Sequence, residues 1–136
     1  MKEKILITGF NGCLAKTLED TMDKNIYQLN YLTTKKSQCS KNIFYWNINA
    51  NYIDPNALLN TTHIIHLSGF NISNRWTAKN KKIMFDSRVK GSALLYDQCV
   101  QLNIKPETFI SASAMGYYGF NRKGIKDENQ PPGNDW

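Results

Sequence analysis

The sequence predicts an α/β fold in which a doubly wound parallel sheet lies between two layers of helices, a three-layer sandwich. The β-branched and apolar run at residues 5–7 is typical of a parallel strand that is buried on both faces. A glycine-rich segment, residues 9–15, follows directly and leads into a helical pattern. Further strand patterns then alternate with helical stretches, which is the order that parallel strands with crossover connections require.

The expected elements follow one another as strand, helix, strand, strand, helix, strand, helix and strand. Their approximate bounds are 4–8, 13–22, 26–32, 43–48, a short helix from Asp54-Pro55, 64–67, 77–102 with or without a break, and 109–113. Leu14, Leu18 and Met22 recur four residues apart and are expected on the inner face of the first helix. Asp54 is a favourable helix cap, and Pro55 is tolerated in the first helical turn.

The net charge of +6 raises the question of a nucleic-acid partner. Lys79, Lys81 and Lys82 fall on a predicted helix, whereas Lys35 and Lys36 follow a predicted strand. A nucleic-acid module would show a denser basic stripe than this. Solvated helix faces and one anion site explain the charge balance better, so no nucleic-acid partner is expected.

The three cysteines, Cys13, Cys39 and Cys99, are widely spaced and form no C-x-x-C pair. Their spacing predicts neither a disulfide framework nor a zinc site and favours a reducing compartment. Lys2 and Lys4 lead directly into a short strand, which is unlike a signal peptide, and no apolar run reaches the length of a membrane span. We expect a cytoplasmic protein with no metal site and no membrane partner.

The glycine-rich segment has the spacing G-x-x-G-x-x-A, a relative of the fingerprint of dinucleotide-binding Rossmann folds. Gly9 allows a sharp turn, and Gly12 lets a pyrophosphate approach the free N–H groups at the start of the following helix. Ala15 is small enough for the helix and the strand to pack closely. A strand-to-helix turn that binds no ligand is the alternative. The cofactor-binding residues expected here are Gly9, Asn11, Gly12, Cys13 and Leu14.

Three further segments make the chain similar to a known family. They are 64–76 (IIHLSG, then NI and RW), 81–92 (KKI, then DSRVKGS) and 109–119 (FISASAMGYYG). In this order they resemble the extended short-chain dehydrogenase/reductases, in particular the NAD-dependent epimerase/dehydratase-like branch, some members of which are labelled cell division inhibitors. The resemblance covers essentially all 136 residues. It implies a Rossmann-type fold and a nicotinamide dinucleotide cofactor, with Cys13 filling space beneath the pyrophosphate.

The length suffices for one domain with a core, but not for two. A complete doubly wound domain has two halves, and the expected elements supply the first half and the start of the second. We therefore expect residues 1–136 to be the N-terminal part of a dinucleotide-binding domain, truncated after its fifth strand. The resemblance implies that the region that binds substrate is absent.

The segment after the second predicted strand carries no acidic residue. NAD-selective folds place an acid there to bind the adenosine ribose, but no Asp or Glu occurs between Asp23 and Asp54. Thr33-Thr34-Lys35-Lys36 stands in its place and offers hydroxyls and positive charge to a 2′-phosphate. The sequence favours NADP over NAD, with Thr34 and Lys35 as binding residues. The alternative is that the two lysines only solubilise a loop.

The resemblance assigns further cofactor contacts. Leu67-Ser68-Gly69 would line the cofactor groove at the carboxyl edge of the sheet, where open α/β folds bind ligands. Arg88, on the long helix, would contact the nicotinamide ribose or a phosphate, and Ser111 is also expected to bind cofactor. A surface pair between Asp86 and Arg88 is the alternative, although residues two positions apart do not share a helix face.

Candidate catalytic residues follow from the same resemblance. In the superfamily a serine at the end of the fifth strand binds substrate, and a tyrosine with a lysine four residues later acts as acid and base. Ser113 matches the serine, but no Y-x-x-x-K pattern exists, and Tyr118 has Arg122 four residues on. Tyr117 and Tyr118 are expected to substitute for the missing tyrosine or, as we favour, to form pocket walls. His66, in mid-strand, is expected to be a hydrogen-bonded core residue.

The resemblance implies an NAD(P)-dependent oxidoreductase or epimerase acting on a nucleotide-sugar-like or small carbonyl substrate, with residues 1–136 alone inactive. The alternative is a dinucleotide-binding protein that has lost catalysis and works as a sensor or partner-binding module. Ser113 favours the first function, and the missing Tyr–Lys pair favours the second. The expected partners are a small-molecule substrate and, through an open apolar sheet edge, further copies of the chain as a homo-oligomer.

Overall fold

The computed structural model describes residues 2–119 and 123–134. The elements are β1 (Glu3–Thr8), α1 (Cys13–Thr21), β2 (Tyr27–Thr33), the 3₁₀ helix η1 (Lys36–Gln38), β3 (Ile43–Asn47), β4 (Tyr52–Ile53), α2 (Pro55–Leu58), β5 (His63–His66), α3 (Ala78–Gln101), β6 (Thr108–Ser111) and the 3₁₀ helix η2 (Met115–Tyr118). The Asp54 carboxylate caps α2 by accepting from the Asn56 N–H at 3.0 Å, as the sequence predicts.

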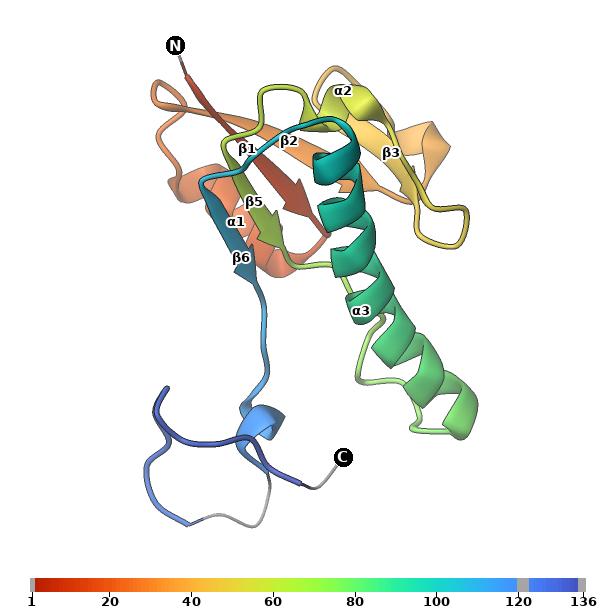
Figure 1. The fold of residues 1–136 in the computed structure, drawn as a ribbon, viewed down its shortest axis with the longest axis vertical. Coiled ribbons are helices and arrows are strands. Elements are labelled where there is room, and N and C mark those ends of the chain that lie inside the picture. Colours follow the sequence, from red (N-terminus) through yellow and green to blue (C-terminus); the bar gives the residue numbers. More distant parts are fainter. Residues whose placement is uncertain (1, 120–122, 135–136) are drawn as a thin grey trace.

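The strands of the described residues form one six-stranded sheet in the order β4-β3-β2-β1-β5-β6 (Figure 1). Neighbouring strands are parallel, except that β3 and β4 are antiparallel. The chain runs outward from β1 through β2 to β3 and then returns to β5 on the other side of β1. This reversal creates a topological switch point between β1 and β5, outside whose carboxyl ends open α/β sheets bind ligands.

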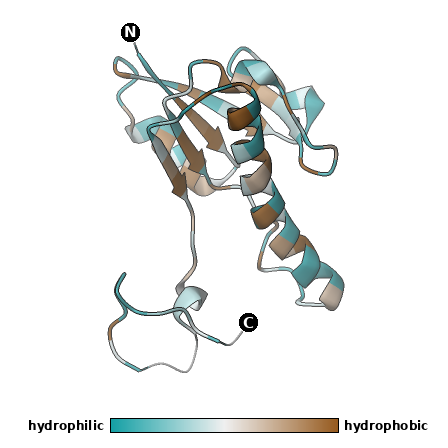
Figure 2. Cartoon of the chain, viewed as in Figure 1, coloured by the Kyte–Doolittle hydropathy of each residue, from teal (hydrophilic) through white to brown (hydrophobic). Residues whose placement is uncertain are grey.

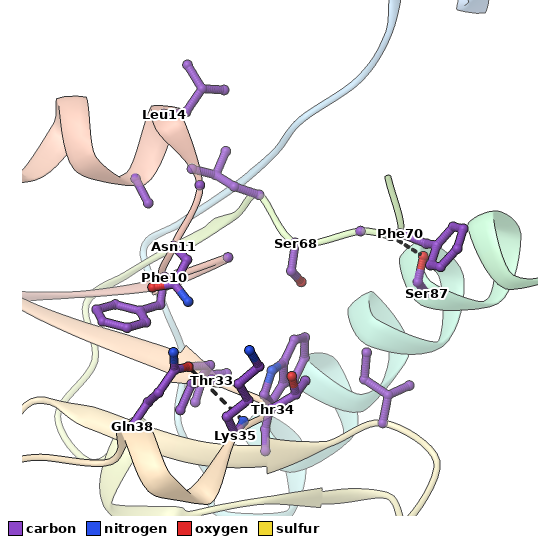
Figure 3. Close-up of a pocket in the computed structure, with 18 of the residues that line it drawn as sticks. Phe10, Asn11, Leu14, Thr33, Thr34, Lys35, Gln38, Ser68, Phe70 and Ser87 are labelled. Carbon is purple, nitrogen blue, oxygen red and sulfur yellow. Dashed lines mark hydrogen bonds between the residues drawn. The ribbon is translucent and has the colours of Figure 1, made fainter. Parts of the chain in front are cut away.

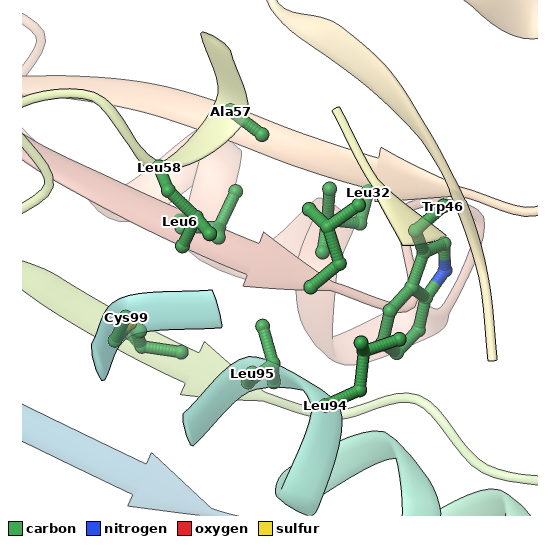
Figure 4. Close-up of a cluster of buried hydrophobic side chains, with 10 residues drawn as sticks. Leu6, Leu32, Trp46, Ala57, Leu58, Leu94, Leu95 and Cys99 are labelled. Atoms are coloured by element: carbon green, nitrogen blue, oxygen red, sulfur yellow. The ribbon is translucent and has the colours of Figure 1, made fainter. Parts of the chain in front are cut away.

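Helices cover both faces of the sheet, so the predicted α/β layering is confirmed (Figure 1). Ile5 and Ile7 pack toward α1, whereas Leu6, between them, faces α2 and α3, because successive strand side chains point to opposite faces. The larger cluster lies on the α2 and α3 side (Figure 4). Its buried members are Leu6, Leu32, Trp46, Ile53, Ala57, Leu58, Ile64, Leu94, Leu95 and Cys99. The central strands are accordingly among the most hydrophobic parts of the chain (Figure 2).

The structure corrects two details of the predicted elements and decides one that was left open. The strand β4 was not predicted, because two residues are too few to show an alternating pattern. The helix α3 runs unbroken over Ala78–Gln101. The last strand ends at Ser111 and not at Ser113, since Ser111 pairs with His66, which is itself the last residue of β5.

The expected inward orientation of Leu14 is also wrong. The Leu14 side chain is 62% exposed, because it lies in the first turn of α1 at the carboxyl edge of the sheet. Ala15 takes the buried position in this turn. Leu18 and Met22, one and two turns further on, pack against the core as expected.

The strand β6 lies at one edge of the sheet, and all of its residues are exposed, including Phe109 and Ile110. An edge with unpaired backbone groups and apolar side chains is prone to pair with another chain. We therefore expect the isolated 136-residue polypeptide to self-associate, with a sedimentation coefficient that rises with concentration. A concentration-independent monomer that unfolds in one sharp transition would contradict this expectation.

Candidate functional site

An open cleft of about 630 Å³ lies at the carboxyl ends of β1, β2 and β5 (Figure 3). Its lining residues are 9–15 after β1, 32–35 and Gln38 around the end of β2, 67–70 after β5, and Trp46, Ile48, Ile83 and Ser87. The cleft therefore coincides with the switch point between β1 and β5. Among the described residues that line it, none carries a carboxylate. The described residues also contain no cluster of three or more His, Cys, Asp or Glu side chains that could hold a metal ion.

The turn between β1 and α1 depends on two glycines. Gly9 has φ +81°, in the left-handed region, and a Cβ there would lie 3.2 Å from the Ser68 nitrogen. Gly12 donates its N–H to the Gly9 carbonyl at 2.8 Å and stands at the N-cap of α1, without a capping side chain. The first N–H groups of a helix have no partner within it, and here they face the cleft. This geometry suits an anion.

The end of β2 places polar groups on the other side of the cleft. The Thr33 hydroxyl donates to Gln38 Oε1 at 2.8 Å and accepts from the Lys35 N–H at 3.2 Å. Thr34 and Lys35 line the cleft, as Figure 3 shows. Lys36 does not line it; its ammonium lies 5.0 Å from the centre of the Tyr45 ring. Lys35 therefore lies in the cleft and Lys36 outside it, although the sequence indicated one positive site for both lysines.

Gln38 is a cleft residue that the sequence analysis missed. It lies on η1, five positions after Thr33, and the hydrogen bond between these two side chains brings it to the cleft. The sequence carried no signal for this placement, because a three-residue 3₁₀ helix shows no hydrophobic periodicity.

The loop after β5 forms the third side. The N–H groups of Leu67 and Ser68 both donate to the Thr8 hydroxyl, each at 3.0 Å. Ser68 Oγ is buried, lies at the cleft and has no hydrogen-bond partner within residues 2–119 and 123–134 (Figure 3). The Phe70 N–H donates to Ser87 Oγ at 2.9 Å, which ties the loop to α3. An unpartnered buried hydroxyl is costly, so Ser68 Oγ is well suited to bond a ligand.

Arg88 lies behind this loop and does not line the cleft. Its Nη1 donates to the Met84 carbonyl at 3.0 Å, and a Cβ on Gly69 would approach its Cζ to 2.9 Å. The alternative Asp86–Arg88 pair is absent. Asp86 instead pairs with Lys82 at 2.7 Å and Lys90 at 3.0 Å, and the hydrogen bonds from these two lysines hold the pKa of Asp86 below its usual value.

The candidate catalytic residues do not reach the cleft. After β6 the chain leaves the sheet, and η2 lies away from it (Figure 1). Tyr117 is 51% exposed, and its ring packs against Tyr118 with centroids 5.1 Å apart. Ser111, Ser113, Tyr117 and Tyr118 are all absent from the cleft lining. Arg122 lies outside the described residues.

Comparison with known proteins decides the family. A model of the NAD dependent epimerase/dehydratase family matches residues 5–135. The chain belongs to this family. The resemblance inferred from the sequence motifs is therefore confirmed.

Relatives within the epimerase family are considerably longer than this chain. An epimerase family protein of Mycobacterium leprae is 28% identical over 97% of the chain, which spans 42% of that relative. A chloroplastic epimerase family protein of Arabidopsis thaliana is 27% identical over 97% of the chain and 40% of its own length. The chain thus spans about two-fifths of these family members.

Solved epimerase-family structures show the same fold. A nucleoside-diphosphate sugar epimerase of Corynebacterium glutamicum matches 99% of the chain and 28% of its own length, with a TM-score of 0.79 and 23% identity. The human epimerase family protein SDR39U1, solved with NADPH, matches 96% of the chain and 43% of its own, with a TM-score of 0.76 and 18% identity.

No helix within the described ranges is long and apolar enough to cross a membrane.

Proposed function

We propose that the cleft binds a nicotinamide dinucleotide, with NADP(H) preferred. The observation that carries the proposal is the glycine turn at the switch point, which opens the N-terminus of α1 onto the cleft. A pyrophosphate fits this position because the helix presents free N–H groups and the positive end of its dipole. The human structural relative, whose structure contains NADPH, supports the same assignment.

The other sides of the cleft match the remaining parts of the cofactor. Lys35, Thr34 and Gln38 offer a cation, a hydroxyl and an amide to a 2′-phosphate, with no carboxylate in the lining to repel it. Ser68 Oγ supplies a hydroxyl that lacks a partner within the described part of the chain. Residues Gly9, Asn11, Gly12, Cys13 and Leu14 would surround the pyrophosphate, and Leu67 and Gly69 would flank the ribose.

We further propose that the complete protein is an NAD(P)-dependent epimerase or oxidoreductase of a nucleotide-sugar-like or small carbonyl substrate. Family membership supports this reaction class, as does a structural neighbour described as UDP-N-acetylglucosamine 4-epimerase from Bacillus cereus, with a TM-score of 0.68. The bound nicotinamide would accept or donate the hydride. Ser113, Tyr117 and Tyr118 are the proposed polar groups for substrate, and Arg88 and Ser111 the proposed outer cofactor contacts. The unpaired cysteines of the described residues favour a cytoplasmic location.

A second function is favoured by one observation: the candidate catalytic side chains do not line the cleft. A protein that binds the dinucleotide without transferring hydride would serve as a sensor or a partner-binding module. Assays of the complete gene product with nucleotide sugars distinguish the two functions. An oxidoreductase changes the absorbance of the nicotinamide, an epimerase returns the hydride and converts the sugar without a net change in absorbance, and a sensor does neither.

The cofactor proposal is tested by titrating the complete gene product with NADPH and NADH while following nicotinamide fluorescence. We expect saturable binding of both, with NADPH the tighter ligand because of Lys35. If neither dinucleotide binds, the proposal is contradicted. If NADH binds more tightly than NADPH, the proposed preference for NADP(H) is contradicted.

A further inference from the structure

The Thr8 hydroxyl, at the end of β1, makes three hydrogen bonds. It accepts from the N–H groups of Leu67 and Ser68, each at 3.0 Å, and lies 2.9 Å from Nδ1 of His66. A hydroxyl oxygen has two lone pairs and one proton. Because the two N–H donors use both lone pairs, the remaining bond must be a donation from the Thr8 hydroxyl to His66 Nδ1.

This donation fixes the tautomer of His66. Nδ1 must be an unprotonated acceptor, so the ring proton of the neutral imidazole resides on Nε2. Nε2 is buried and lacks a well-formed hydrogen bond to any described residue, although the Arg88 backbone lies near enough to favour a proton there. The ring is enclosed by α3, because a Cβ on Gly91 would lie 3.2 Å from its Cε1.

The surroundings of the ring favour the neutral form. Trp46 on β3 and Phe109 on β6 each place an aromatic ring 6.3 Å from it, and β1 contributes the uncharged Thr8. The charged group that acts on it is the Arg88 guanidinium on α3. Burial is the main cause that lowers the pKa of His66 from 6.5; the Arg88 backbone partly opposes it, and the Arg88 guanidinium has the smallest effect and lowers the pKa further. His66 is therefore neutral at neutral pH and gains its proton only under acidic conditions.

We propose that Thr8 and His66 form a positioning pair that holds the Leu67–Ser68 side of the cleft in place, and that protonation of His66 releases it. A protonated His66 carries a proton on Nδ1, which then needs an acceptor. The Thr8 oxygen cannot accept from Nδ1 and from both loop N–H groups at once. One loop N–H group loses its partner, and Ser68, whose Oγ faces the cleft, moves out of position. The consequence for dinucleotide affinity rests on the proposed function; the tautomer and the loop do not.

The first test needs no ligand. Nitrogen-15 spectra of the complete gene product should show His66 as the Nε2–H tautomer near pH 8, and the protection factors of the Leu67 and Ser68 amides should fall as His66 titrates. An Nδ1–H tautomer would overturn the inference, and so would protection factors of the two amides that stay constant while His66 titrates. His63, the second histidine of the 136 residues, lies near the Glu3 carboxylate and serves as the internal reference.

The second test uses NADPH affinity between about pH 8 and pH 5. We expect the wild type to bind about threefold to tenfold more weakly once His66 is protonated, which corresponds to one lost hydrogen bond. The variant His66→Asn keeps an acceptor oxygen close to the position of Nδ1 but does not titrate, so its acid-dependent loss should be smaller than that of the wild type by the part due to His66. The 2′-phosphate of the ligand also gains a proton in this range and contributes equally to every variant. The matched control His63→Asn should retain the loss. Equal acid-dependent losses in both variants would overturn the proposal.

Substitutions of Thr8 test the same positioning pair without changing the buried imidazole ring. Thr8→Ser retains the hydroxyl and should behave as the wild type, whereas Thr8→Val, of similar shape, should bind NADPH weakly at every pH with no acid-dependent step through His66. Identical behaviour of the serine and valine variants would contradict a positioning role. If NADPH binds at no pH, the proposed function fails, and the tautomer and amide-exchange measurements still decide on the positioning pair.

Discussion

Replacing Gly12 with valine is expected to abolish NADPH binding while the sheet stays folded. Gly12 is exposed at the N-cap of α1, and its φ of −74° and ψ of 153° are accessible to any residue. A Cβ there would lie 3.0 Å from the Gly9 carbonyl oxygen, which must shift by a few tenths of an ångström, and the branched side chain would cover the helix N–H groups. Losing two hydrogen bonds to a charged pyrophosphate costs at least about 100-fold in affinity.

Fluorescence titration with NADPH measures this loss, and circular dichroism with thermal unfolding checks that the variant folds. The graded control is Gly12→Ala, because its single methyl group covers less of the helix N–H groups than the branched valine. The alanine variant should retain more of the NADPH affinity than the valine variant. Normal binding by the folded Gly12→Val variant would show that the pyrophosphate does not lie at this turn.

Charge reversal at Lys35 is expected to remove the preference for NADPH over NADH. Lys35 lines the cleft, and a charge-assisted hydrogen bond to a 2′-phosphate is worth about 1.5–3 kcal/mol, or roughly a 10- to 100-fold change in affinity. Lys35→Glu should therefore weaken NADPH binding by at least this factor and leave NADH binding nearly unchanged. Parallel titrations with the two dinucleotides at low ionic strength measure the effect.

The neighbouring lysine provides a matched control with the same change of charge. Lys36 lies over the Tyr45 ring and outside the cleft, so Lys36→Glu should reduce NADPH affinity only slightly. The double variant Lys35→Glu, Lys36→Glu should resemble Lys35→Glu alone. If the wild type binds NADPH and NADH with equal affinity, and the double charge reversal changes neither affinity, then these lysines only solubilise a loop.

The layout of the fold could be predicted because its strong local signals agree with the tertiary structure. The apolar run before Gly9 forms β1, and residue types that cap and begin a helix do so at Asp54 and Pro55. The expectation that His66 is a hydrogen-bonded core residue is confirmed, since its side chain is 3% exposed and bonded to Thr8. His66 could be placed in this way because it lies in a run of apolar residues, and such a run indicates a buried strand.

The rest depends on tertiary geometry that no local pattern encodes. The amphipathic spacing of Leu14 is ideal, yet the first turn of α1 has no strand to cover it. The directions of Lys35 and Lys36 differ because η1 begins between them, and the same short helix brings Gln38 to the cleft. The roles of Ser113, Tyr117 and Tyr118 stay predictions, since their placement away from the sheet follows from the course of the chain after β6.

The central claim is that the cleft between β1 and β5 binds a nicotinamide dinucleotide. A crystal structure of the complete gene product with NADPH tests it most directly. We predict the pyrophosphate against the N–H groups that follow Gly12 at the start of α1, and the 2′-phosphate within hydrogen-bond reach of Lys35. Well-ordered NADPH bound elsewhere on the molecule, with the glycine turn free of phosphate, would contradict the claim.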